Sequence, residues 1–165
     1  MIKPALAIMS RVPSVEGKSR LSGVLTPVQR VALQWAFLED TLNKIRQMPE
    51  FKCFIAATPA DETDKLKYLA GAGEEVIPQP EGSLGQRMLG IAGEIFTRGY
   101  SPVVLIGTDV PSLPPYFLLE TLKLLDHYDL VLGPSVDGGY YLIGMRYLVD
   151  GVFIGIDWGT ETVLD

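Results

Sequence analysis

Short apolar runs alternate along the chain with longer segments in which apolar residues recur every three or four positions. The short runs predict buried strands, because a strand covered on both faces is apolar at nearly every position. The longer segments predict helices with one apolar face. We expect strands at residues 5–10, 51–57, 75–78, 102–106, 130–133, 140–145 and 153–156, and helices at residues 26–47, 60–69, 83–99 and 114–125.

The alternation of strands and helices predicts the α/β class, a Rossmann-like three-layer α/β/α fold with a mostly parallel sheet. The strands at 130–133 and 140–145, joined by a short turn, are the candidates for an antiparallel member. Residues 157–165 begin a further helix that the sequence leaves incomplete. This ending fits a truncated chain, a naturally short variant, or a partner chain that completes the sheet.

Length and composition narrow the class of protein. With 165 residues and 47% hydrophobic residues, we expect one folded domain spanning residues 1–165. No apolar stretch approaches the roughly 18 residues of a membrane span, and no secretory signal opens the chain, so we expect a cytoplasmic protein. Cys53 and His127 are the single cysteine and histidine. One cysteine and one histidine exclude an internal disulfide and a zinc cluster of histidines and cysteines, and we expect a core cysteine and a surface histidine.

The charge is unevenly distributed. The net charge of −6 opposes nucleic-acid binding, but five of the 14 basic residues fall in the first thirty positions, where Glu16 is the one acidic residue. A small basic patch of this kind suits a compact anion such as a nucleotide diphosphate.

The loop at residues 107–112 directly follows the expected strand 102–106. Ligands of open α/β sheets gather at the carboxyl ends of the strands, and Pro111 keeps the backbone before it extended. The carboxylate of Asp109 would therefore suit Mg²⁺ or Mn²⁺ bridging nucleotide phosphates. The alternative is that Asp109 only caps the loop or the next helix.

The loop after the first strand carries Lys18, Ser19 and Arg20, a hydroxyl with one cation on each side. Together with Gly17 they form a candidate phosphate clamp, and the alternative is a solvated basic loop. The Walker pattern of phosphate-binding ATPases is absent, because its first glycine is missing.

Two weaker candidates remain. Residues 133–141 carry Asp137, Gly138 and Gly139, a hairpin signal that also lets a ligand approach the backbone. Residues 82–87 carry Gly85 and Arg87 at a helix start, which suits an anion or a ribose but equally an ordinary loop.

Five segments together resemble the nucleotide-diphospho-sugar transferase superfamily. They are KSRL at 18–21, FLEDTL at 37–42, SLGQRM at 83–88, LIGTDVPSL at 105–113 and LGPSVDGGYYLIG at 132–144. The nearest group is similar to a bacterial GT-A-type glycosyltransferase family first catalogued as a domain of unknown function (DUF2064-like). KSRL is shared with the more distant phospholactate guanylyltransferases.

The resemblance implies roles for the candidate residues. Asp109 would hold the metal ion, and the turn that begins at Asp137 would face the acceptor. Within that turn, our own expectation is that Asp137 activates or orients the acceptor hydroxyl. The remaining roles are phosphate and nucleotide binding by Arg11, Lys18, Ser19, Arg20 and Thr108, contact with the base or ribose by Gly85 and Arg87, and an acceptor side formed by Gly138, Gly139 and Tyr140.

The sequence departs from the family pattern at two places. Many GT-A enzymes carry an Asp-x-Asp pair, but residue 107 is glycine, so the metal needs a second ligand. The family also continues past the WGT segment at 158–160 to a later acidic motif, and we expect this chain to lack that C-terminal segment.

Three functions follow from these expectations. The first is a metal-dependent glycosyltransferase that uses a nucleotide-activated sugar and a small acceptor. The second is a nucleotidyltransferase, similar to phospholactate guanylyltransferases, that releases pyrophosphate. The third is a nucleotide-binding protein without turnover, and self-association stays open in all three.

Overall fold

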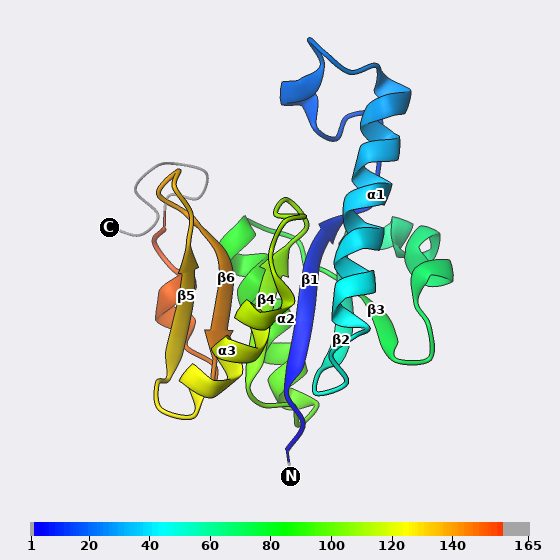
Figure 1. Ribbon diagram of the computed structural model, residues 1–165. Helices are drawn as coiled ribbons and strands as arrows, with labels where there is room; N and C mark the ends of the chain where they lie inside the picture. The colour runs from blue at the N-terminus through cyan, green and yellow to red at the C-terminus, as the bar shows by residue number, and fades with distance from the viewer. Residues whose placement is uncertain (1, 157–165) are drawn as a thin grey trace.

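In the computed structural model, which describes residues 2–156, a six-stranded sheet lies between two layers of helices (Figure 1). The strands are β1 (Ala5–Arg11), β2 (Lys52–Thr58), β3 (Glu74–Pro78), β4 (Val103–Gly107), β5 (Leu130–Pro134) and β6 (Tyr140–Met145). The α-helices are α1 (Pro27–Ile45), α2 (Leu84–Thr97) and α3 (Pro115–Leu125). Three 3₁₀ helices are η1 (Ser19–Leu21), η2 (Ala60–Leu69) and η3 (Asp150–Phe153).

The strands lie in the order β3-β2-β1-β4-β6-β5. The first four strands are parallel, whereas β6 runs antiparallel to both β4 and β5. This confirms the α/β class and the mostly parallel sheet. The last residues of β1 to β4 and the β5–β6 turn at residues 135–139 therefore share one edge of the sheet, here called the carboxyl edge. The opposite one is the amino edge.

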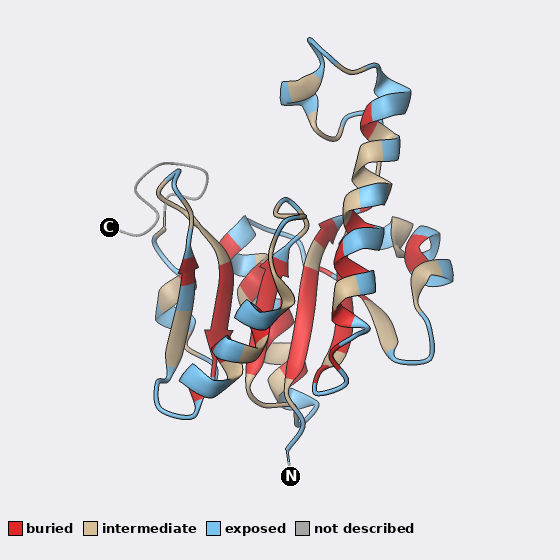
Figure 2. Cartoon of the chain, viewed as in Figure 1, coloured by how far each residue is buried: buried red, intermediate tan, exposed pale blue. Residues whose placement is uncertain are grey.

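Two buried apolar clusters fix the layers. Alternate residues of β1 point to opposite faces, so Leu6 and Ile8 pack with α1 and α3, whereas Ala5 and Ala7 pack with α2. Figure 2 shows that burial follows the strands and the half of α1 that covers them. The first half of α1 and the loop before it project beyond the carboxyl edge (Figure 1).

Two of the helices begin at the carboxyl edge with the same local device. The side chains of Thr26 and Ser83 accept hydrogen bonds from the backbone N–H of Gln29 and Gln86, each at 3.3 Å. Each glutamine side chain in turn accepts from the backbone of its capping residue. These capping boxes satisfy N–H groups that the first helical turn leaves unpaired, and they fix where α1 and α2 start.

The expected strand at residues 153–156 is wrong. The chain instead forms η3, which brings Phe153 into the apolar cluster beside α2, and Gly155 then turns the backbone with φ +75°. An apolar run of four residues cannot distinguish these outcomes, because burial of one side chain satisfies it without a ladder. The helical turn expected at 157–165 lies outside the described residues.

Within residues 2–156, no helix combines the length and the apolar character needed to cross a membrane. Cys53 is buried in the core, as its strand position predicts, and His127 is exposed just after α3.

Gly144 on β6 lets α3 pack closely on the sheet. A Cβ added there would lie 2.8 Å from Cγ2 of Thr121 and 3.0 Å from Cδ1 of Leu125. We expect Gly144→Ala to lower the free energy of unfolding by about 1–3 kcal/mol in urea titrations, because α3 must shift. Gly151→Ala, where a Cβ meets nothing within 4 Å, is the control. Equal stability of the two variants would contradict this packing.

Candidate functional site

The sequence-predicted site residues all come from segments at the carboxyl edge. Arg11 ends β1, Lys18, Ser19 and Arg20 follow in the loop before α1, Gly85 and Arg87 lie in the first turn of α2, Thr108 and Asp109 follow β4, and Asp137, Gly138, Gly139 and Tyr140 belong to the β5–β6 turn and the start of β6. What these residues bind stays a prediction.

Lys18 and Asp109 form an ion pair across the carboxyl edge. The ammonium Nζ contacts Oδ1 of Asp109 and lies 5.1 Å from the ring centroid of Phe37. The side chain of Lys18 is 20% exposed and that of Asp109 is 74% exposed. The pair therefore joins the loop after β1 to the loop after β4 and leaves most of the carboxylate accessible.

Side chains of α1 hold the loop that carries Lys18. Gln34 donates to the carbonyl of Ser14 at 2.8 Å and accepts from its N–H at 3.3 Å, so one amide satisfies both backbone groups. Buried Arg30 donates from Nη1 to the carbonyl of Gly17 at 3.3 Å. Lys18 then adopts a left-handed backbone with φ +53°. The sequence analysis missed Arg30 and Gln34, whose spacing of four residues on one helix face is the available signal.

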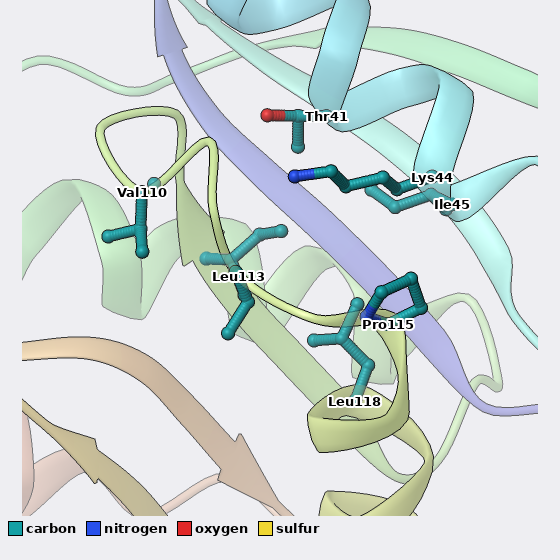
Figure 3. A pocket seen from close by; sticks show the side chains of 9 residues that line it. Thr41, Lys44, Ile45, Val110, Leu113, Pro115 and Leu118 are labelled. Carbon is teal, nitrogen blue, oxygen red and sulfur yellow. The ribbon is translucent and has the colours of Figure 1, made fainter.

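The loop that carries Asp109 is anchored by apolar contacts (Figure 3). Val110 and Leu113 line a cavity of about 10 Å³ together with Thr41 and Ile45 of α1. A cavity of this size holds at most about one water molecule, so it takes no substrate. Leu113 also packs against the apolar cluster beside α1 and α3, which anchors the loop.

The β5–β6 turn holds Asp137 as an anion. Its Oδ1 accepts from the hydroxyl of Ser135 and, at 3.3 Å, from the N–H of Gly139. These bonds lower the pKa of Asp137, and the positive charge of Arg20 lowers it slightly further. A carboxylate with a lowered pKa is a weak base, so the geometry suits orienting a hydroxyl better than removing its proton.

Tyr140 and Tyr141 face opposite sides of the sheet. Tyr140 packs in the cluster beside α2, where burial raises its pKa, and Tyr141 packs in the cluster beside α1 and α3. No ion pair or hydrogen bond links residues 135–139 of this turn to Lys18 or Asp109.

The arginines divide by edge. At the amino edge, Arg46 pairs with Glu74 at 2.9 Å, Arg98 with Glu75 at 2.7 Å, and Arg146 with Asp129 at 3.9 Å. At the carboxyl edge, four arginines have no carboxylate within 4 Å among residues 2–156: Arg11, Arg20, Arg30 and Arg87. These arginines therefore have no ion-pair partner among residues 2–156, at the edge where ligands of this fold class bind, although Arg20 lies near enough to Asp137 to lower its pKa.

The donors around Asp109 limit how a metal ion could be held. Residues 2–156 contain no group of three or more His, Cys, Asp or Glu side chains arranged to hold a metal ion. Asp109 thus offers one carboxylate, which fits Mg²⁺ where substrate phosphates and water supply the other oxygens.

The three-layer fold and the polar carboxyl edge place the chain in the structural class of nucleotide-diphospho-sugar transferases. Residues 41–160 match the family model described as "Uncharacterized protein conserved in bacteria (DUF2064)". The chain belongs to this family.

Similar proteins agree with this placement. A solved structure from Desulfovibrio desulfuricans G20, described as a "putative nucleotide-diphospho-sugar transferase", is 33% identical with a TM-score of 0.90 over 99% of this chain and 72% of its own. A 3-phospho-D-glycerate guanylyltransferase from Phenylobacterium zucineum (strain HLK1) is 31% identical over 86% of this chain, which spans 66% of that relative's length. A cytidylyltransferase from Leptospira borgpetersenii serovar Hardjo-bovis shares the fold at 17% identity and a TM-score of 0.62, over 92% of this chain and 64% of its own.

Gln34→Ala tests how the Lys18 loop is held. We expect trypsin to cleave native protein after Lys18 or Arg20 several times faster, because the loop loses the two hydrogen bonds between Ser14 and Gln34. The free energy of unfolding should fall by only about 1 kcal/mol. Gln47→Ala, which removes one hydrogen bond to Asn43 at the far end of α1, is the control. Unchanged cleavage in Gln34→Ala would show that Gln34 does not hold the loop.

Proposed function

We propose that this protein is a transferase that uses a nucleotide substrate, bound at the carboxyl edge. The arginines without an ion-pair partner at the same edge as the Lys18–Asp109 pair, among residues 2–156, are the observation that carries the proposal. Phosphate groups are the ligands that such cations bind best, through forked and charge-assisted hydrogen bonds. The guanylyltransferase relative and the nucleotide-diphospho-sugar transferase structure support the same class.

The preferred reaction is nucleotidyl transfer to a small phosphorylated acid. A nucleoside triphosphate and such an acid carry more phosphoryl groups than a nucleotide sugar and a neutral acceptor, which suits several unpaired cations. An oxygen of the acceptor phosphate would attack the α-phosphorus, and the bond from that phosphorus to the β-phosphate oxygen would break. Pyrophosphate would leave with the electron pair, stabilised by Lys18 and Arg20.

Asp109 would hold a Mg²⁺ or Mn²⁺ ion, which would neutralise phosphate oxygens when bound. Glycosyl transfer is the second candidate, favoured by the assignment of the Desulfovibrio structure. In that reaction the same cations would stabilise a leaving nucleoside diphosphate, and Asp137 would orient the acceptor hydroxyl.

Product analysis separates the reactions. We expect pyrophosphate release when the protein is incubated with GTP or CTP and a series of phosphorylated acids. Release of free nucleoside diphosphate from nucleotide sugars would favour glycosyl transfer instead.

Lys18→Gln should lower kcat/KM roughly 100-fold, as loss of one stabilising donor does, whereas Lys123→Gln on α3 should not. Equal activity of both variants would remove Lys18 from the mechanism.

Asp109→Asn tests the metal proposal by binding alone. Calorimetric titrations with UDP, GDP, dTDP and CDP, with and without Mn²⁺, should show a metal-dependent gain in affinity for at least one nucleotide. We expect Asp109→Asn to lose that gain, because an amide is a weaker ligand for a hard cation. If nucleotide affinity changes with neither the substitution nor the metal, a binding protein without turnover is favoured. If none of the four nucleotides binds, the proposal of a nucleotide site is wrong.

A further inference from the structure

The guanidinium of Arg87 has a neutral amide, and no carboxylate, as its hydrogen-bond partner among residues 2–156. It lies half-buried in the first turn of α2, where Nη1 donates to Oε1 of Gln79 at 3.1 Å. Its Nε is buried and has no hydrogen-bond partner among residues 2–156. A buried N–H without an acceptor costs free energy, so an incoming acceptor that reorders this guanidinium would recover it.

Gln79 fixes that guanidinium without neutralising it. The residue is 4% exposed and follows β3 directly. Its Nε2 donates to the carbonyls of Ala56 at 2.7 Å and Ser10 at 3.2 Å, so strands β2 and β1 both hold the amide. With the amide nitrogen committed to two carbonyls, the oxygen faces Arg87. A carboxylate in this place would cancel the charge that an amide preserves.

Arg11 adds a second positive charge to the same place. It follows Ser10, whose carbonyl holds Gln79, and the alternation along β1 puts it on the same face as Ala5 and Ala7, which α2 covers. Burial lowers the pKa of Arg87, and the charge of Arg11 lowers it further. Two neighbouring cations without a carboxylate repel each other, and an anion relieves that repulsion. The contrast within α2 is direct, because Arg98 at the other end of the helix has both Glu75 and Glu94 as partners.

We propose that Arg11 and Arg87 form an anion subsite, positioned by Gln79, that binds a phosphoryl group of the substrate. The proposal rests on the proposed function and deepens it. It also changes the role that the family resemblance implied for Arg87, from contact with the base or ribose to contact with phosphate. The subsite is separate from Lys18, whose charge Asp109 already balances in the free protein.

Inorganic tripolyphosphate, which has charge and no base, and guanosine, which has a base and no charge, are the two probes. By calorimetry, Arg87→Gln and Arg11→Gln should each weaken tripolyphosphate binding roughly tenfold or more, the effect of losing hydrogen bonds to a charged group. Neither should change guanosine binding. Arg98→Gln removes the same charge from the same helix and should leave both affinities unchanged.

Three results would overturn the subsite. They are no tripolyphosphate binding by the wild-type protein, an affinity within twofold of wild type in Arg87→Gln, and a loss of guanosine affinity as large as that of tripolyphosphate. The last result would assign Arg87 to the base.

Gln79→Glu tests the positioning role. The carboxylate would pair with Arg87, so tripolyphosphate binding should fall as far as in Arg87→Gln, and it should depend less steeply on salt because one cation is neutralised. If Gln79 has only a structural role, Gln79→Glu would lower the stability of the fold without changing the salt dependence of tripolyphosphate binding. If Gln79→Glu does not fold, Gln79→Met removes the bond to Arg87 but no charge. Affinity should then fall severalfold with the salt dependence retained, and unchanged affinity would exclude positioning.

These binding measurements do not require turnover. If the proposed function fails, no pyrophosphate or nucleoside diphosphate is released, yet tripolyphosphate binding still depends on Arg87. If the subsite fails, turnover is found and tripolyphosphate binding does not depend on Arg87.

Discussion

The common direction of β1 to β4 is the constraint on which the site depends. Because the four strands are parallel, the loops that follow them leave the sheet at the same edge. The reversal at β6 brings the β5–β6 turn there as well. Lys18 and Asp109, 91 positions apart in the chain, meet for this reason, since β1 and β4 are neighbours in the sheet.

The placement of carboxylates then decides what each edge can do. At the amino edge, acidic residues form ion pairs with the arginines that follow α1, α2 and β6. These arginines are therefore already neutralised by the protein itself. At the carboxyl edge, Asp109 pairs with Lys18, whereas the four arginines there have no ion-pair partner among residues 2–156. A chain with a net charge of −6 thus keeps four arginines at one edge without an ion-pair partner in its described part, and such cations favour encounter with anions.

The sequence predicts the parts of this arrangement that depend on local pattern. Asp109 stands out because an apolar run ends just before it and Pro111 delays the next helix. Its contact with Lys18 could not be predicted, because the path of that loop depends on Gln34 and Arg30, which reach back 20 and 13 residues. Local pattern carries no information about such contacts.

Gln79 was missed for a related reason. In the sequence it is one polar residue between Pro78 and Pro80, a pattern typical of an exposed turn. Its burial depends on carbonyl groups at the ends of β1 and β2, which only the assembled sheet brings to it. The error at residues 153–156 is similar, because Phe153 finds its partners on α2 rather than on a neighbouring strand.

Stability and ligand binding therefore draw on different parts of the molecule. The two apolar clusters and the paired amino edge stabilise the fold, whereas Arg30 and Arg87 each keep a buried Nε with no hydrogen-bond partner among the described residues. Each such group costs about 1–3 kcal/mol in the free protein. Arg30 holds the Lys18 loop, and Arg87 faces the neutral amide of Gln79. A carboxylate beside either arginine would pair with it and cancel the charge, so the same absence of acidic partners that weakens the free protein leaves the positive charge on which the proposed phosphate binding depends.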